Sequence, residues 1–372
     1  MKHTVLMAHP SPDLYGSDRM MVESVRALVT SNRVVVALPS EGPLGPVLRE
    51  AGAEVVLLGT PVLRKAHLSP VGLVSLALAA LRALVPAVRL LRRERAAALY
   101  VNTVTLPLWL LAGAIARVPS LCHVHEAEEH PSRLVRAALA APLRLARLVV
   151  VNSRASAAVL GGLRTQVIYN GVDGPAGALP LRAELTGPIR LVLVGRWSPR
   201  KGTDLAVRAA GLLADRGHEV LLTLVGDVFP GYEWFEQELR DQAGPQTVFA
   251  GFQESVWGAF ADADIVLVPS RVEPFGNVAV EGMLAGRPVV AAATQGLVEI
   301  VRDGETGVLV RPGDACALAD GVEVLVKDWT AARNLAKAGN SEARRRFGRA
   351  RYRDQIQHAV HELITARTPT SR

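Results

Sequence analysis

The chain alternates between short, strongly apolar segments and longer stretches with helical periodicity, and no other feature constrains its fold more. The apolar segments are rich in Val, Leu and Ile, and such strands alternating with helices indicate βα units on a parallel sheet. The first series is TVLMAHP, RVVVALP, EVVLLG, ALYVNT, SLCHVHE, LVVVNS and QVIYNG. The second series is RLVLVGR, VLLTLVG, TVFAGF, DIVLVPS, PVVAAA and GVLV. The sequence therefore predicts an α/β protein with two doubly wound, Rossmann-like domains.

The turn-rich stretch GVDGPAGALPLRAELTGP lies between the two series and is the expected domain boundary. We predict an N-terminal domain over residues 1–180 and a C-terminal domain over 188–350, which suits a length of 372 residues. Residues 351–372 are charged and begin with a helical period, so we expect a helix that packs outside one domain or crosses between both. Because ligands of such sheets bind at the carboxyl ends of strands, the expected site is a central cleft between two facing domains.

Cysteine usage and the amino terminus favour the cytoplasm. Cys122 and Cys316 are too few and too far apart for a disulfide framework or a metal cluster. The first residues, MKHTVLMAHPSPDLYG, lack the long apolar region and small-residue cleavage site of a secretory signal. We therefore expect a cytoplasmic protein without a structural metal.

Positive charge is concentrated in the first half of the chain. The net charge is +7, and residues 1–186 hold 20 Lys and Arg against 12 Asp and Glu. This excess indicates an anionic surface or ligand for the first half. The sequence lacks the zinc spacing, helix-turn-helix pattern and aromatic interleaving of nucleic-acid-binding modules, so we expect no nucleic-acid partner.

Two carboxylates eight residues apart flank a predicted helix start in SRVEPFGNVAVEGMLAGRPVV. Glu273 lies on the loop after an expected strand, Asn277 suits the N-cap, and Glu281 points away from the apolar face of the helix. The backbone N–H groups of residues 275–277 favour an anion or a hydroxyl-rich ligand. The alternative is that Glu273 caps a loop and Glu281 is solvated.

A second cluster lies in LVLVGRWSPRKGTDLAVRAA, where Arg196, Arg200 and Lys201 lead from a strand into a helix. Cations at a helix N-terminus oppose the helix dipole, and a bound anion would relieve that conflict. A diphosphate suits an Arg and a Lys together. The alternative is solvated side chains, at a cost of about 0.3–1 kcal/mol per charge.

The segments GRWSPRKG, VIYNGVD and EPFGNVAVEGMLAGRPVV together resemble the retaining glycosyltransferases of family 4, which have the GT-B fold. By this resemblance Arg196 and Lys201 hold the donor diphosphate, and Glu281 binds the ribose hydroxyls. Glu273 and the backbone of residues 275–277 bind the transferred sugar and its phosphate. The donor-binding residues so implied are Gly16, Gly195, Arg196, Lys201, Glu273, Phe275, Gly276, Asn277 and Glu281.

Two further segments depart from the family pattern or match it weakly. In ATQGLVEIV, Gln295 stands where the family has the first glycine of a Gly-Gly-x-x-Glu loop, which affects the role of Glu299. In SPDLYGSDRMM, Gly16 resembles the family's glycine loop facing the diphosphate, without its second glycine.

In SLCHVHEAEEH, His125 ends the fifth expected strand and by resemblance contacts the donor sugar. The implied catalytic residues are therefore Glu273, His125, Arg196 and Lys201. Strand alternation sends His123 and His125 to one side without a third ligand, so we predict no metal. Glu126 and the acidic residues after it are expected either at a solvated loop edge or at a polar acceptor.

The resemblance implies transfer of a sugar from a nucleoside diphosphate sugar, with UDP favoured, to an acceptor hydroxyl with the anomeric configuration retained. No cofactor beyond the donor is expected. The acceptor belongs to polysaccharide, glycolipid or natural-product synthesis, and is lipid-linked or soluble. The alternatives are a nucleotide-sugar epimerase or a phosphorylase on the same fold, or a catalytically silent sugar-nucleotide-binding subunit.

The segment LSPVGLVSLALAALRALVPAVRLLRRER allows two interpretations. Its apolar run is shorter than the roughly 20 residues that span a bilayer, so we expect no transmembrane helix. One interpretation is a helix buried against the sheet that ends in a solvated basic cluster. The other is peripheral contact of the N-terminal domain with an anionic membrane on the cytoplasmic side.

Overall fold

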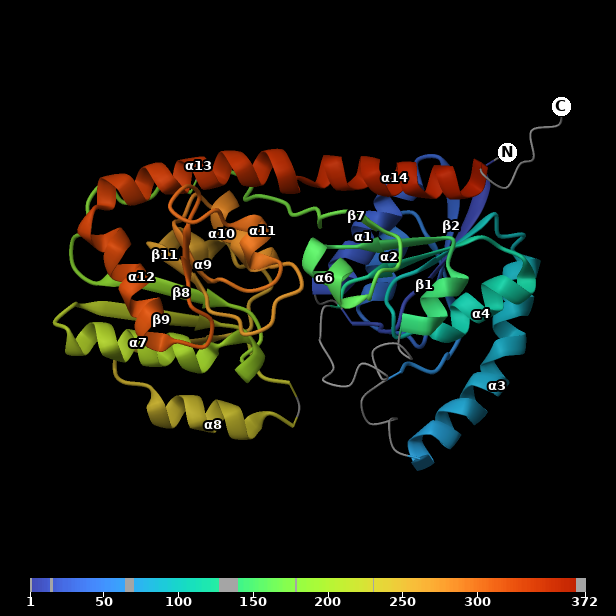
Figure 1. Ribbon diagram of the computed structural model, residues 1–372, viewed down its shortest axis with the longest axis horizontal. Coiled ribbons are helices and arrows are strands. Elements are labelled where there is room, and N and C mark those ends of the chain that lie inside the picture. The colour runs from blue at the N-terminus through green and yellow to red at the C-terminus, as the bar shows by residue number, and fades with distance from the viewer. Residues whose placement is uncertain are drawn as a thin grey trace. The chain divides into compact units, whose positions relative to one another are not determined.

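The computed structural model describes residues 2–13, 16–63, 70–126, 140–177, 179–229 and 231–365 (Figure 1). The chain forms two compact units. The first unit combines Met1–Gly171 with Arg349–Arg372, and the second is Val172–Gly348. Each is built on one parallel sheet, and all thirteen strands predicted from the apolar segments are confirmed.

The first unit contains a seven-stranded parallel sheet in the order β3-β2-β1-β4-β5-β6-β7. Its strands are β1 (His3–Ala8), β2 (Asn32–Leu38), β3 (Glu54–Leu57), β4 (Ala98–Val101), β5 (Ser120–Val124), β6 (Leu148–Val151) and β7 (Thr165–Val167). In β1, Val5 pairs with Val34 of β2 on one side and with Ala98 of β4 on the other. The strand order therefore reverses at β1, and the carboxyl ends of β1 and β4 form the topological switch point where such sheets bind ligands.

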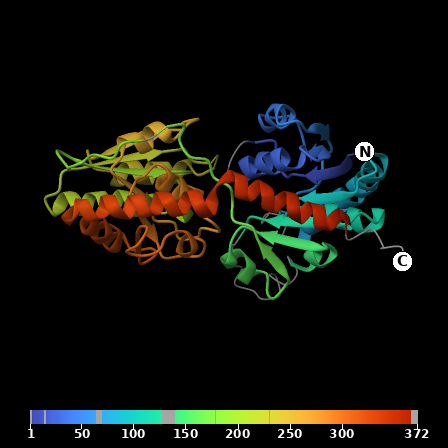
Figure 2. The same ribbon diagram turned by 90° about the horizontal axis from the view of Figure 1, so that it is seen from above.

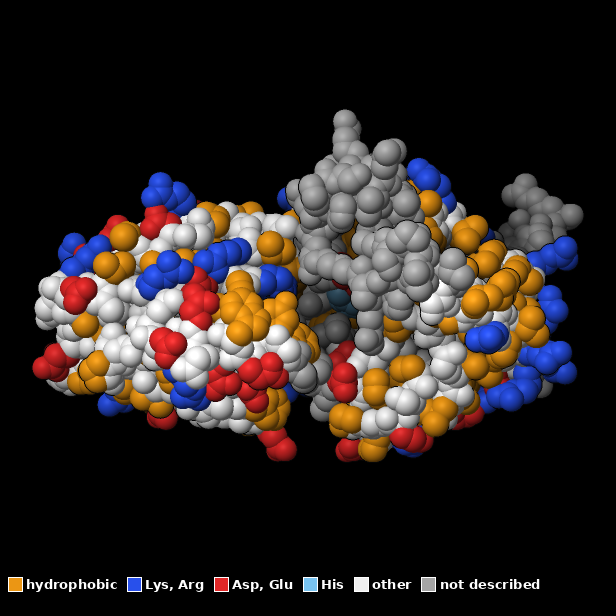
Figure 3. Space-filling view, turned by 90° about the horizontal axis from the view of Figure 1, so that it is seen from below, with side chains coloured by type: hydrophobic (Ala, Val, Ile, Leu, Met, Phe, Trp, Pro, Cys, Tyr) orange, Lys and Arg blue, Asp and Glu red, His pale blue; other side chains and the backbone are white. Residues whose placement is uncertain are grey.

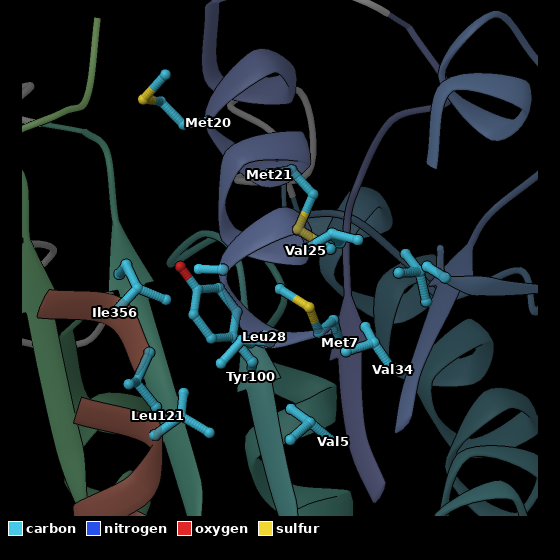
Figure 4. Packing of buried hydrophobic residues seen from close by; sticks show 14 of the residues in the cluster. Val5, Met7, Met20, Met21, Val25, Leu28, Val34, Tyr100, Leu121 and Ile356 are labelled. Atoms are coloured by element: carbon cyan, nitrogen blue, oxygen red, sulfur yellow. The ribbon is translucent and has the colours of Figure 1, made fainter. Parts of the chain in front are cut away.

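Helices cover both faces of this sheet because alternate strand residues are buried on opposite sides. They are α1 (Gly16–Leu28), α2 (Leu44–Glu50), α3 (Pro70–Arg93), α4 (Pro107–Ala116), η2 (Ala141–Leu145), α6 (Arg154–Val159) and α14 (Arg349–Thr365). On one face, Val5 and Met7 pack with residues of α1 and α14, as Figure 4 shows. On the other face, Leu6 and Ala8 pack in a second core with α3, α4 and η2. These cores hold the strand ends, which carry polar residues, in fixed positions.

The last helix, α14, belongs to the first unit and lies against α1 and strands β4 and β5 (Figure 2). Tyr352 is fully buried, and its hydroxyl lies 2.7 Å from the Ser24 hydroxyl of α1. Arg353 donates to the buried carboxylate of Glu23 at 2.6 Å. These contacts attach the carboxyl-terminal helix to a domain that begins more than 300 residues earlier, at β1.

The second unit contains a six-stranded parallel sheet in the order β10-β9-β8-β11-β12-β13. Its strands are β8 (Ile189–Val194), β9 (Val220–Val225), β10 (Thr247–Gly251), β11 (Ile265–Val268), β12 (Val289–Ala292) and β13 (Val308–Val310). Its helices are η3 (Pro199–Lys201), α7 (Thr203–Asp215), α8 (Glu233–Gln242), α9 (Trp257–Asp262), α10 (Asn277–Leu284), α11 (Leu297–Ile300), α12 (Ala315–Lys327) and α13 (Trp329–Phe347). Strands β8 and β11 are neighbours, since Leu191 pairs with Ile265 in parallel register. The order reverses between them, so their carboxyl ends form the switch point of this unit.

The turn between η3 and α7 touches the end of β11 because residue 202 is a glycine. Gly202 has φ +70°, and a Cβ placed on it would lie 2.1 Å from the carbonyl oxygen of Pro269. A non-glycine residue would therefore force the two backbones apart in addition to adopting a left-handed conformation. This close approach brings the loop after β8 against the loop after β11.

We expect Gly202→Ala to destabilise the protein more than Gly217→Ala. Gly217 also has a positive φ of +89°, but a Cβ there meets nothing within 4 Å, so it is a matched control for backbone strain alone. The control should cost about 1 kcal/mol and Gly202→Ala about 2–4 kcal/mol, measured by urea unfolding. Equal losses in the two variants would show that the contact with Pro269 is not constraining.

Candidate active site

The loops after β8 and β11 are joined by backbone and side-chain hydrogen bonds. The N–H of Arg271 donates to the carbonyl of Arg200 at 2.8 Å, and the Arg200 guanidinium donates to the carbonyl of Val272 at 3.3 Å. Arg271 also donates to both carboxylate oxygens of Asp204, each at 2.7 Å. The two loops therefore form one continuous structure at the switch point.

Asp204 is a structural residue of this site that was not predicted from the sequence. It lies in the first turn of α7, is buried, and receives hydrogen bonds from Arg271 and Arg208. Burial acts to raise the pKa of Asp204, but the hydrogen bonds and charges of these two arginines outweigh it and leave the pKa below its ordinary value. An acidic residue in a first helical turn was the available signal.

The cations of this loop precede α7 and do not occupy its first turn. Arg200 and Lys201 lie in the short helix η3, and α7 begins at Thr203. Gly202, a left-handed residue, separates η3 from α7, so Arg200 and Lys201 lie directly before the start of the long helix. The Ser198 side chain caps η3 by accepting from the N–H of Lys201.

Lys201 and Glu273 form an ion pair between the two loops. The Nζ of Lys201 lies 2.5 Å from Oε2 of Glu273, which also accepts from the Ser270 hydroxyl at 3.1 Å. Glu273 is 7% exposed. Burial acts to raise the pKa of Glu273, but Lys201, the charge of Arg200 and the Ser270 hydrogen bond together lower it below the ordinary value. Glu273 is consequently a carboxylate at neutral pH.

Gln295 supports the backbone of Glu273. Its side-chain oxygen accepts from the N–H of Glu273 at 3.0 Å, while the carbonyl of Glu273 accepts from the N–H of Gly296 at 3.0 Å. Gln295 has φ +39°, a conformation that glycine adopts more easily. Gln295, which replaces the family's glycine, thus keeps a left-handed backbone. Its side chain also makes a hydrogen bond that glycine could not make. Glu299 lies in α11, half-buried.

Helix α10 starts one residue away from the predicted cap. Gly276, with φ +116°, occupies the N-cap position, and Asn277 is the first helical residue, so the assignment of Asn277 as the cap is wrong. Glycine adopts this left-handed conformation without strain, and a Cβ at position 276 would lie 2.6 Å from the Leu297 side chain, so a larger residue would not fit at the cap. The four residues expected on the apolar face of α10, Ala279, Val280, Met283 and Leu284, are buried. Glu281 lies between buried neighbours and is itself half-buried.

Phe275 and Arg196 occupy different surroundings in the second unit. Phe275 is 2% exposed, and its ring packs edge-on against Phe347 of α13 with the centroids 5.6 Å apart. Only the backbone of Phe275 is therefore suited to face a ligand. Arg196 follows Gly195 at the end of β8 and places its guanidinium 3.5 Å from the centroid of the Phe229 ring, in the loop after β9. This cation–π contact orients Arg196.

A chain of buried hydrogen bonds joins the ends of β1, β4 and β5 in the first unit. Asp18 accepts from Nε2 of His9 at 2.8 Å, and Nδ1 of His9 accepts from the Asn102 amide at 2.9 Å. The Asn102 oxygen in turn accepts from Nε2 of His125 at 3.0 Å. Because an amide nitrogen only donates and an amide oxygen only accepts, Asn102 fixes the proton of His125 on Nε2 and leaves Nδ1 as an acceptor.

His125 is held neutral in these surroundings. Burial, with a smaller contribution from His9, lowers the pKa of His125 to about 4. His123 packs against it with the ring centroids 4.1 Å apart and is itself fully buried, with a pKa also lowered by burial. The sequence motif predicted His125 but not His9 and Asn102, although each of these also directly follows a strand.

Glu126 is part of the framework of the strand ends. It accepts from the Thr103 hydroxyl and, at 2.9 Å, from the N–H of His125, and burial raises its pKa above the ordinary value. The alternative of a solvated loop edge is therefore wrong for Glu126, and the acidic residues after it lie outside the described residues. Gly16 is the first residue of α1.

The predicted site residues are divided between the two units. Gly16 and His125 belong to the first, and the others belong to the second, where Lys201 and Glu273 are in direct contact. Across the described residues, no group of three or more His, Cys, Asp or Glu side chains is arranged to hold a metal ion. Within the same ranges, no helix combines the length and hydropathy needed to cross a bilayer.

We expect the stability of the protein to fall as the pH drops from about 6.5 to about 4. The unfolded state takes up a proton on residue 125 near its ordinary pKa of 6.5, whereas the folded state resists protonation down to about 4. In His125→Gln, the slope of unfolding free energy against pH should decrease by up to about 1.4 kcal/mol per pH unit in this window. His358→Gln, at an exposed histidine of α14, is the control for the loss of a histidine outside this site. An unchanged slope in His125→Gln would contradict the prediction.

Both halves of the chain are similar to known glycosyltransferases. Residues 15–174 match the family described as "Glycosyltransferase Family 4", and residues 188–328 match the family described as "Glycosyl transferases group 1". Among curated proteins, glycogen synthase of Mycobacterium tuberculosis is 33% identical over 46% of this chain and 42% of its own length. The phosphatidyl-myo-inositol mannosyltransferase of Mycobacterium leprae is 32% identical over 54% of each chain. The chain thus aligns with about half the length of these curated relatives.

Solved structures match over nearly the whole chain. HepE from Anabaena, in complex with UDP and glucose, is 26% identical with a TM-score of 0.80, covering 96% of this chain and 99% of its own. Sucrose-phosphate synthase from Thermosynechococcus elongatus is 22% identical with a TM-score of 0.77, covering 98% and 100%. The fold is accordingly GT-B, with two Rossmann-like domains. The two family matches together cover most of both units, and the chain belongs to the group 1 glycosyltransferases of family 4.

Proposed function

We propose that the protein transfers a sugar from a UDP-sugar to an acceptor hydroxyl with retention of the anomeric configuration. The observation that carries this proposal is the Lys201–Glu273 ion pair, held where β8 and β11 end and directly before α10. Solved structures of HepE, which has 26% identity over most of its length, contain UDP and UDP-glucose, and this supports a UDP-linked donor.

The charges of the second unit suit a diphosphate. Arg271 pairs with Asp204, and Lys201 pairs with Glu273, whose pKa is also lowered by the charge of Arg200. Two cations, Arg200 and Lys201, therefore lie beside one buried carboxylate at a switch point. In glycosyl transfer the departing diphosphate gains negative charge, and cations already in position stabilise that charge without reorganisation. Arg196 and Lys201 are proposed to do so, with Gly195 allowing close approach.

Glu273 is proposed to bind the transferred sugar. An ionised carboxylate accepts hydrogen bonds from sugar hydroxyls, and Lys201 and Gln295 hold its side chain and backbone in place. The backbone of residues 275–277 at the start of α10 offers N–H groups to the donor phosphate. Glu281, one helical turn further, is proposed to bind the ribose hydroxyls. The departing phosphate itself is the proposed acceptor of the proton from the incoming hydroxyl.

The first unit is proposed to contribute Gly16 to the donor phosphates and His125 to the donor sugar. Because Asn102 holds the proton of His125 on Nε2, Nδ1 is the atom that would accept a sugar hydroxyl. We propose that no metal or cofactor beyond the donor takes part. The acceptor is lipid-linked or soluble, and the name of the Mycobacterium leprae relative, a phosphatidyl-myo-inositol mannosyltransferase, supports a lipid acceptor. We propose that the protein acts in the cytoplasm.

Lys201→Ala should weaken the binding of UDP by about 1.5–3 kcal/mol and the binding of UMP much less. The reason is that the lost charge is assigned to the second phosphate. Isothermal titration calorimetry measures both affinities. Arg216→Ala is the control, because Arg216 also forms an ion pair, with Asp320, but on the exposed surface of the same unit. Equal losses for UDP and UMP in Lys201→Ala would remove the assignment of Lys201 to the diphosphate.

Glu281→Ala should weaken donor binding by about 1–3 kcal/mol through lost hydrogen bonds to the ribose. Glu273→Ala should reduce kcat far more than it reduces nucleotide affinity.

A panel of UDP-sugars screened by thermal shift identifies the donor, and NMR of the product reads its anomeric configuration. A product of inverted configuration, or a kcat unaffected by Glu273→Ala, would contradict the proposed reaction.

A further inference from the structure

Helix α3 of the first unit exposes a row of apolar side chains. Leu78, Leu81 and Val85 are 49%, 68% and 51% exposed. They are three and four residues apart, so they lie on one side of the helix. Its opposite side, with Ala83, Ala87 and Leu91, is buried in the core. Helix α3 is thus buried against the sheet on one side and ends in exposed arginines, as one interpretation predicts, but it also exposes these three apolar side chains.

Arginines continue the same row toward the end of the helix. Arg82, Arg89 and Arg92 follow the same spacing and are all exposed. No described residue forms an ion pair with Arg82 or Arg89. Arg93, by contrast, pairs with Glu94 at 2.9 Å, and Glu94 also pairs with Arg33. Glu94, the carboxylate nearest to α3 in sequence, thus pairs with Arg93 and Arg33 and not with Arg82 or Arg89.

Helix α4 extends this surface. Its Leu111 and Ile115 are 41% and 45% exposed and lie one helical turn apart. The Arg92 guanidinium donates to the carbonyl of Ile115 at 3.4 Å, so the end of the α3 row lies beside the α4 row. We define the α3–α4 face as Leu78, Leu81, Arg82, Val85, Arg89, Arg92, Leu111, Ile115 and the exposed Arg117. In the space-filling view, hydrophobic side chains and Lys or Arg lie side by side toward the right edge (Figure 3).

The positive charge of the α3–α4 face favours an anionic membrane surface over a second copy of this chain as its binding partner. Neither α3 nor α4 contains an acidic residue. A second copy of this chain in a two-fold contact would present the same patch and bring unneutralised arginines against one another. An anionic bilayer surface instead offers phosphate groups to the arginines and acyl chains to the leucines, which is how amphipathic helices lie in a membrane interface.

We propose that the α3–α4 face docks the protein on an anionic lipid surface. The apolar row of α3 enters the boundary between headgroups and acyl chains, while Arg82 and Arg89 contact lipid phosphates. This inference goes beyond the proposed reaction and requires neither donor nor acceptor. If the proposed function also holds, docking brings a lipid-linked acceptor to the first unit.

The test is co-sedimentation of the full chain with vesicles of phosphatidylcholine alone or mixed with phosphatidylglycerol, at low and high salt. We expect binding to the anionic vesicles that weakens with salt. The triple variant Leu78→Ser, Leu81→Ser, Val85→Ser should bind at least about tenfold more weakly, because the apolar area that enters the membrane is lost. Arg82→Gln with Arg89→Gln should weaken binding by about fivefold per arginine.

The matched control is Val248→Ser with Val324→Ser, at valines 44% and 60% exposed in the second unit, and it should bind as the wild type does. Thermal unfolding verifies that every variant is folded, and UDP binding, measured without lipid, reports separately on the proposed function. Absence of binding to anionic vesicles at low salt would overturn the inference, as would wild-type binding by the triple variant. A dimer in sedimentation velocity that the triple variant abolishes would assign the face to a second copy instead.

Discussion

The site in the second unit depends on the close approach of two backbones at the ends of β8 and β11. Only a glycine at position 202 lets the turn reach the carbonyl of Pro269, and this contact places Lys201 beside Glu273. Once Glu273 is buried, its charge requires a partner, because an unpaired buried carboxylate costs several kcal/mol. The ion pair, the Arg271–Asp204 pair and the backbone bonds between the loops therefore support one another.

The first unit follows the same physical rule with a chain of hydrogen-bonded polar side chains. His9, Asn102 and His125 follow strands whose two faces are covered by helices, so polar atoms at these positions are buried and must be paired. The hydrogen-bond chain to Asp18 satisfies them and sets which nitrogen of His125 carries the proton. Burial lowers the pKa of His125, and the hydrogen bond with Asn102 fixes its tautomer.

The sequence pattern of α3 did not indicate which of its apolar side chains are buried and which are exposed. The apolar residues of α3 are numerous enough to supply both a buried side and an exposed one, and Leu78 and Leu91 are of the same type although only the second is covered. Which leucines are covered is decided by the sheet and by α4. The basic excess of the first half, visible in composition, becomes informative once arginines and exposed leucines share one row.

The two parallel sheets, all their strands, the family and the segments that hold Lys201 and Glu273 could be predicted from the sequence, because period-two burial, glycine turns and local motifs are encoded within short windows. The sequence by itself did not determine the partners of those residues. Asp204 and Arg271 are 67 residues apart, and His9 and Asn102 are 93 apart. Tertiary structure alone decided these pairs, the cap at Gly276 and the exposed row of α3, because each depends on a contact with a distant segment.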